Sequence, residues 1–217
     1  MPTFKHIPTG KRFFFIHIPR TAGRYIMPNL LENNCECEQG EGEGLWEMKN
    51  NIELPHYHRD YYEKYLDVKD IPHFAVVRNP IDRFISASIR IVDDYGKNVD
   101  IDDNFLSWVL YSTDYHNFFK PQVDFISDKT HIWKYEDGMG KEFDNWLSGI
   151  LGIDISFSID KDVIYLQNPS PLESINPPKL RKNLKLIDNL KHFYRQDIEQ
   201  FYPQLDSPLP KGEETKT

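Results

Sequence analysis

Cysteine is scarce in this chain: only Cys35 and Cys37 occur among 217 residues, with one residue between them. Such close neighbours make a poor disulfide, and sparse cysteine use is typical of proteins from a reducing compartment. We therefore expect a cytoplasmic protein with two unpaired surface thiols. A Cys-x-Cys metal clip is the alternative.

Long hydrophobic runs are also absent. No apolar stretch approaches the roughly 20 residues that cross a bilayer. The opening Met-Pro-Thr-Phe-Lys-His has neither the apolar segment nor the cleavage site of a signal peptide. We expect no membrane span and no secretion leader, which agrees with a cytoplasmic location.

Basic residues are outnumbered, and the formal net charge is −8. This balance argues against nucleic acid as a partner, because nucleic-acid binding usually needs a basic face. It leaves room for a small anionic ligand held by a few local arginines. The 39% hydrophobic and 28% charged content fits a globular fold. We expect one domain over residues 1–203 and a flexible tail over 204–217.

Strand-like and helix-like segments alternate along the chain. Strands are expected at about 12–18, 72–78 and 131–135, and helices at about 22–33, 58–66, 80–92, 102–111, 140–151 and 178–201. Residues 34–55 and 153–178 read as irregular. This alternation predicts an α/β protein in three layers, with a mainly parallel sheet flanked by helices on both faces.

The segment from Phe13 to Ile26 carries the clearest chemical signal. An aromatic strand breaks at Pro19 into a short basic turn, and a helix follows. Backbone N–H groups and the helix dipole at such a turn favour an anion, such as phosphate or sulfate. Arg20 lies in this turn, and Arg78 follows the next strand. Ligands of parallel sheets bind beyond the carboxyl ends of the strands, so both arginines are expected to face one ligand.

Two segments carry a resemblance to a known family. Ile16-His-Ile-Pro-Arg-Thr-Ala-Gly23 resembles the phosphosulfate-binding loop of heparan sulfate and carbohydrate sulfotransferases, usually His-Ile-Pro-Lys-Thr-Gly-Gly followed by Thr or Ser. Val76-Val-Arg-Asn-Pro-Ile-Asp-Arg-Phe-Ile-Ser-Ala87 is similar to their second signature, which holds the donor's 3′-phosphate. Weaker echoes occur at Pro121-Gln122, Lys134–Asp137, Asn168, Tyr194 and Asp197.

The resemblance implies a P-loop-like fold and an activity. The donor would be 3′-phosphoadenosine 5′-phosphosulfate (PAPS), the product 3′-phosphoadenosine 5′-phosphate (PAP), the acceptor a glycan or another small hydroxylated molecule, and no metal would be needed. The implied donor-binding residues are Arg20, Thr21, Ala22, Gly23, Arg24, Tyr25, Arg78 and Ser86. Neither the acceptor's identity nor the oligomeric state follows from the sequence.

His56-Tyr-His58 resembles the His-Gly-His of uronyl 2-O-sulfotransferases, in which the second histidine is the base. By this match His58 would take the acceptor proton, and His56 would orient it or contact the acceptor. Arg20 would assist the leaving oxygen, as the family's lysine does. Two histidines without a role, or half a metal site in a metal-dependent hydrolase, are the other readings of this pair.

Two departures from the family motif leave a further alternative. Arg20 stands where lysine is usual, and Arg24 where Thr or Ser is usual. A nucleotide- or glycan-binding protein of the same fold, with weak or no catalysis, therefore remains a second hypothesis. We expect His17 in the core or directly behind the residues that contact the ligand. We also expect Asp82 and Arg83 as a helix-surface ion pair, and a solvated basic face over 179–185.

Overall fold

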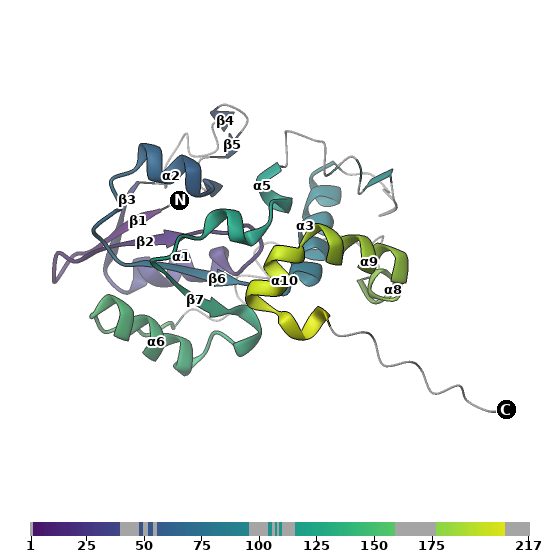
Figure 1. Cartoon of the computed structure of the whole chain (residues 1–217). Helices are drawn as coiled ribbons and strands as arrows, with labels where there is room; N and C mark the ends of the chain where they lie inside the picture. Colours follow the sequence, from purple (N-terminus) through teal and green to yellow (C-terminus); the bar gives the residue numbers. More distant parts are fainter. Residues whose placement is uncertain are drawn as a thin grey trace.

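Figure 1 shows the computed structural model, which describes residues 2–39, 48–49, 52–53, 56–95, 104–105, 107, 109, 116–158 and 177–206. Its centre is an open five-stranded sheet in the order β3-β1-β2-β6-β7. The strands are β1 (Thr3–His6), β2 (Arg12–Ile16), β3 (Cys35–Gln39), β6 (His73–Val77) and β7 (Thr130–Lys134). Helices flank both faces, so the expected three-layer α/β architecture is confirmed.

The parallel part of the sheet contains the three strands that the sequence predicts. β2 pairs with β6 in parallel, with Ile16 opposite Ala75, and β6 pairs with β7 in parallel, with Val77 opposite Lys134. Every residue of β6 is buried. The three strands therefore end at one edge of the sheet, where ligands of parallel sheets bind.

The antiparallel part was not expected. β1 pairs antiparallel with both β2 and β3, so the reading of 34–55 as irregular is wrong for Cys35–Gln39. A second, two-stranded sheet joins β4 (Met48–Lys49) to β5 (Ile52–Glu53). β3 alternates cysteine with glutamate, so its residues face inward and outward in turn and no apolar run marks it.

The two cysteines lie on the same face of β3, and neither forms a disulfide. Cys35 is buried, and Cys37 is half-buried against the same core cluster. The expectation of two surface thiols is therefore wrong for Cys35. Burial raises the pKa of the Cys35 thiol to about 11, which keeps it protonated and unreactive.

Side chains of β2 alternate between two cores. Phe13 and Phe15 pack with α1 (Gly23–Glu32) and α6 (Lys141–Leu151), whereas Phe14 and Ile16 pack with α2 (Arg59–Tyr65) and α10 (Arg195–Phe201). Figure 1 shows α6 and α2 on opposite sides of the sheet. The central strands are thus buried on both faces, as their continuous apolar sequence indicates.

A third core cluster joins α3 (Pro80–Tyr95) to α5 (His116–Phe119) and α9 (Leu184–Phe193). The sequence predicts one helix over 178–201, but the structure has three: α8 (Pro177–Arg181), α9 and α10. The break before α9 has a clear cause, because the Asn183 side chain accepts a hydrogen bond from the Leu186 N–H and caps a new helix.

Two other segments that the sequence assigns, the helix at 102–111 and the irregular stretch at 153–178, are described only in part. Of the helix expected at 102–111, the structure describes residues 104, 105, 107 and 109 as helical, and residues 159–176 lie outside the description. Pro203–Asp206 forms one 3-10 turn whose Leu205 packs against the core. The domain division at residue 203 stays a prediction.

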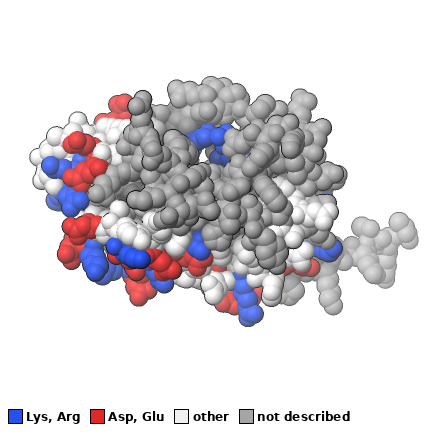
Figure 2. Space-filling view, turned by 90° about the horizontal axis from the view of Figure 1, so that it is seen from above, with Lys and Arg blue, Asp and Glu red and all other residues white. Residues whose placement is uncertain are grey.

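No helix among the described residues combines the length and apolarity that a bilayer span requires. Seen from above, acidic and basic side chains are interspersed along the described surface at the left and lower margin (Figure 2).

Candidate functional site

The loop after β2 has a constrained backbone. Arg20 and Ala22 both adopt left-handed conformations, with φ of 68° and 80°, which are uncommon for residues other than glycine and often occur at functional sites. The buried Thr21 hydroxyl donates a hydrogen bond of 2.8 Å to the Ile18 carbonyl and closes the turn. Ala22 is the N-cap of α1, so the first N–H groups of that helix have no intrahelical acceptor.

The structure brings the two predicted motifs together. Arg20 Nε donates a hydrogen bond of 3.1 Å to the Ser86 hydroxyl on α3. Arg78 Nη1 donates one of 3.3 Å to the Arg20 carbonyl oxygen. The loop, the end of β6 and α3 therefore meet at the carboxyl edge of the sheet, as expected from their positions in the sequence.

Arg78 is held from a third strand as well. Its guanidinium lies 4.6 Å from the centroid of the Tyr135 ring, in the residue that directly follows β7. Such a cation–π contact fixes the plane of the guanidinium. The Lys134–Asp137 segment, a weak signal in the sequence, thus supplies a contact to the site.

A histidine pair lies beside the loop. The rings of His17 and His56 meet edge to face at 4.7 Å, and His56 is 5% exposed. Asn117 donates a hydrogen bond of 2.9 Å to the His56 carbonyl and fixes this segment. A Cβ built on Gly23 would overlap the His17 imidazole, so His17 packs directly against the start of α1.

Both of these histidines are neutral at pH 7. Burial, with added repulsion from the Arg20 guanidinium, lowers the pKa of His56 to about 3. Burial and the neighbouring His56 also lower the pKa of His17 well below its ordinary value. The expectation of His17 in the core is consistent with this position, although its ring reaches the loop.

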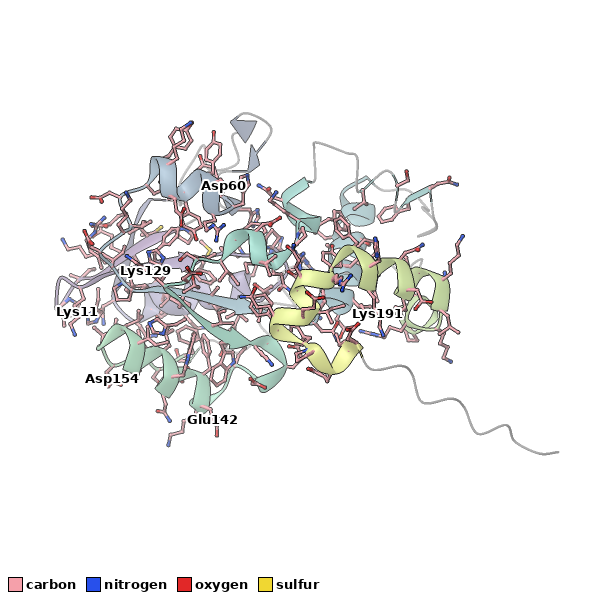
Figure 3. All side chains as sticks on the ribbon, viewed as in Figure 1. Lys11, Asp60, Lys129, Glu142, Asp154 and Lys191 are labelled. Carbon is pink, nitrogen blue, oxygen red and sulfur yellow. The ribbon has the colours of Figure 1, made fainter. Side chains whose placement is uncertain are left out.

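His58 lies at the start of the next helix. It is the half-buried N-cap residue of α2, and its ring meets Tyr61 edge to face at 6.2 Å. Asp60, labelled in Figure 3, marks the first turn of the same helix. His56 of the same triplet contacts His17 beside the loop.

The remaining predicted loop residues differ in orientation. Arg24 is exposed. The Tyr25 hydroxyl donates a hydrogen bond of 3.1 Å to the Met139 carbonyl, and its ring packs edge to face on Phe157. Tyr25 is thus engaged with the α6 side of the molecule, and its donor-binding role stays a prediction.

The expected surface ion pair between Asp82 and Arg83 is wrong. Arg83 is fully buried and donates hydrogen bonds to the carbonyls of Phe118 and Lys120, at 3.0 and 2.6 Å. Asp82 pairs instead with Arg181 of α8 at 2.9 Å. The basic residues Arg181, Lys182 and Lys185 are exposed, as expected for a solvated face.

Within the described residues, no cluster of three or more His, Cys, Asp or Glu side chains is arranged to hold a metal ion. Two guanidinium groups, those of Arg20 and Arg78, meet at the loop, and such groups can bind an anion.

Comparisons with known proteins show a likeness to a solved structure. No protein-family model and no curated protein matches the chain. Among solved structures, the chain is similar to a crystal structure of a sulfotransferase from Alicyclobacillus acidocaldarius, at 15% sequence identity and a TM-score of 0.40, over 91% of this chain and 87% of that one. At this level the likeness assigns no residue a role.

Proposed function

We propose that the protein is a sulfotransferase that moves a sulfuryl group from PAPS to a hydroxyl group of a carbohydrate. The observation that carries the proposal is the contact between its two anion-binding motifs, through Arg20 to Ser86 and Arg78 to Arg20. PAPS has an anionic group at each end of its ribose, and a chain that binds it needs two adjacent anion sites.

Each motif takes one end of the donor. The backbone of residues 20–25 at the start of α1 and the Arg20 guanidinium hold the 5′-phosphosulfate. Arg78 and Ser86 hold the 3′-phosphate, since a guanidinium can bind a phosphate through two hydrogen bonds. Tyr135 under Arg78 and the carbonyl of Arg20 keep this guanidinium in place.

The transfer is an in-line displacement. The acceptor oxygen forms a bond to sulfur as the bond from sulfur to the bridging phosphate oxygen breaks, and PAP leaves. His58 accepts the acceptor's proton. Arg20 stabilises the negative charge that develops on the bridging oxygen. His56 packs on His17 beside the loop and sets the position of the segment that carries His58.

One observation favours the second candidate, a donor-binding protein without turnover. Arg20 replaces the usual lysine, and its Nε is already committed to the Ser86 hydroxyl. An arginine held in this way follows a leaving oxygen less freely than a lysine on its flexible stem.

The two candidates separate in one experiment. The protein is incubated with PAPS and a panel of glycans, release of PAP is measured, and binding of PAP is measured by calorimetry. PAP release that depends on a glycan supports the transferase. Tight PAP binding without release over the whole panel supports the binding protein, and no binding of PAP contradicts both.

A further inference from the structure

The backbone of Arg78 is held by the side chain of Gln122. Gln122 Oε1 accepts a hydrogen bond of 2.9 Å from the Arg78 N–H, and Gln122 Nε2 donates one of 2.8 Å to the Arg78 carbonyl. β6 ends at Val77. The Gln122 amide therefore pairs with Arg78 as a strand residue would and extends the ordered backbone by one residue.

Gln122 is itself fixed by a buried carboxylate on α10. Asp197 Oδ2 accepts hydrogen bonds from Gln122 N and Nε2, at 2.9 and 3.2 Å, and Oδ1 accepts one from Val123 N at 3.0 Å. Both Gln122 and Asp197 are fully buried. With its Nε2 shared between Arg78 and Asp197, the amide of Gln122 has one orientation.

The Asp197 carboxyl is buried beside Arg83. Burial raises its pKa above the ordinary value, and Arg83 and the three N–H donors offset only part of this rise. A buried carboxylate is costly unless hydrogen bonds compensate it. The three hydrogen bonds that the Asp197 side chain accepts come from residues 122 and 123, the segment that meets Arg78.

Asn79, the next residue, is also held by a side chain. Glu136 Oε1 accepts a hydrogen bond of 2.7 Å from the Asn79 N–H, and Glu136 Oε2 accepts one of 2.7 Å from the Tyr202 hydroxyl. The C-terminal segment thus fixes two consecutive peptide units between β6 and α3. An arginine on a backbone fixed in this way presents its guanidinium at one place, which lowers the entropy cost of binding a phosphate.

We infer that Gln122 and Asp197 are positioning residues for the 3′-phosphate site: they hold the Arg78 backbone so that its guanidinium is aimed at the phosphate before the donor binds. This inference rests on the proposed function, in which Arg78 contacts that phosphate. It gives α10, more than 100 residues away in the chain, a part in donor selection.

The test uses Gln122→Met, which keeps the length of the side chain and removes both amide groups. Calorimetry measures the Kd of PAP and of adenosine 5′-phosphate, which lacks the 3′-phosphate. We expect PAP binding to weaken by about 10-fold or more, as for the loss of one or two hydrogen bonds, and binding of adenosine 5′-phosphate to change by less than about 2-fold. Gln196→Met, an exposed change on α10, is the matched control and leaves both values unchanged.

A double-mutant cycle distinguishes positioning from general support of the fold. If Gln122 acts through Arg78, Gln122→Met causes no further loss of PAP affinity in an Arg78→Ala background. Equal losses for both nucleotides, or additive losses in the cycle, would overturn the inference. If Gln122→Met does not fold, as judged by circular dichroism, Asp197→Asn is measured in the same cycle and the same outcomes decide.

The controls separate this inference from its premise. A wild-type protein that binds PAP no better than adenosine 5′-phosphate contradicts the proposed 3′-phosphate site, and the inference falls with it. A wild-type protein that prefers PAP and loses the preference in Arg78→Ala, but keeps it in Gln122→Met, contradicts the positioning role alone.

Discussion

Arg20 Nε and the Ser86 hydroxyl are joined by a hydrogen bond of 3.1 Å, across the 66 residues that separate them in the chain. Arg20 belongs to the loop after β2, and Ser86 lies on the second turn of α3. The bond therefore joins the motif assigned to the 5′-phosphosulfate with the motif assigned to the 3′-phosphate. Under the proposed function the two motifs bind different ends of the donor, so nucleotides with and without the 3′-phosphate distinguish changes at one motif from changes at the other.

Replacing Arg78 by alanine removes the cation assigned to the 3′-phosphate. We expect the binding free energy of PAP to weaken by about 1–3 kcal/mol, as for a lost hydrogen bond to a charged group. Binding of adenosine 5′-phosphate should change little, because that nucleotide lacks the phosphate in question. Calorimetry with both nucleotides measures this difference. Equal losses on the two would contradict the assignment of Arg78.

His58→Ala tests the proposed base. We expect turnover to fall by about 10²–10⁴-fold while the Kd of PAP is retained, because a general base acts on the acceptor and not on the donor. His192→Ala, an exposed histidine on α9, is the matched control. His56→Ala is measured beside them. Unchanged turnover in His58→Ala with a large loss in His56→Ala would move the base to His56.

The buried His56 predicts a fall in stability at acid pH. Its folded pKa of about 3 lies below the unfolded value of about 6.5. Between these values the unfolded chain binds more protons than the folded one. The contribution of His56 to the free energy of unfolding is therefore complete above pH 6.5 and is lost as the pH falls towards 3. The slope approaches about 1.4 kcal/mol per pH unit for one histidine.

Urea unfolding of the wild type and of His56→Gln at pH 7.5 and at pH 5 measures this effect. The variant should lose less free energy of unfolding than the wild type between the two pH values, because glutamine does not titrate. His192→Gln should follow the wild type. The same loss in all three proteins would show that His56 is protonated as readily in the folded state as in the unfolded one.

The fold was predictable where a segment carries its own signal. β2 and β6 are continuous apolar runs buried on both faces, and α6 has an apolar stripe at helical spacing. β1 and β3 have no such run, because each alternates apolar with polar residues, and they pair antiparallel with one another. The break of the C-terminal helix at Asn183 depends on a cap that helical spacing alone does not reveal.

Within the candidate site, the residues that belong to sequence motifs were predictable, and the contacts between distant segments were not. Arg20, Arg78 and Ser86 follow from motifs at the ends of parallel strands, and the structure brings them together. The contact of His56 with His17, and the bonds from Gln122 to Arg78, depend on how distant segments pack over the loop. The sequence offered only an isolated Pro121-Gln122 and an alternating His-x-His as signals for them.

Gly23 at the start of α1 provides the sharpest test of the loop's packing. A Cβ at this position would overlap the His17 imidazole, which is held between the loop and His56. We expect Gly23→Ala to lower the free energy of unfolding by about 1–3 kcal/mol, the usual cost of overpacking, and to weaken PAP binding.

Gly149→Ala is the matched control, because nothing lies within 4 Å of a Cβ at this exposed position of α6. It should raise stability by about 0.5–1 kcal/mol through helix propensity alone, and the double variant Gly23→Ala/His17→Ala should recover part of the loss. A Gly23→Ala protein as stable as Gly149→Ala would show that His17 does not pack on the loop, and the histidine pair would then have no contact with the donor site.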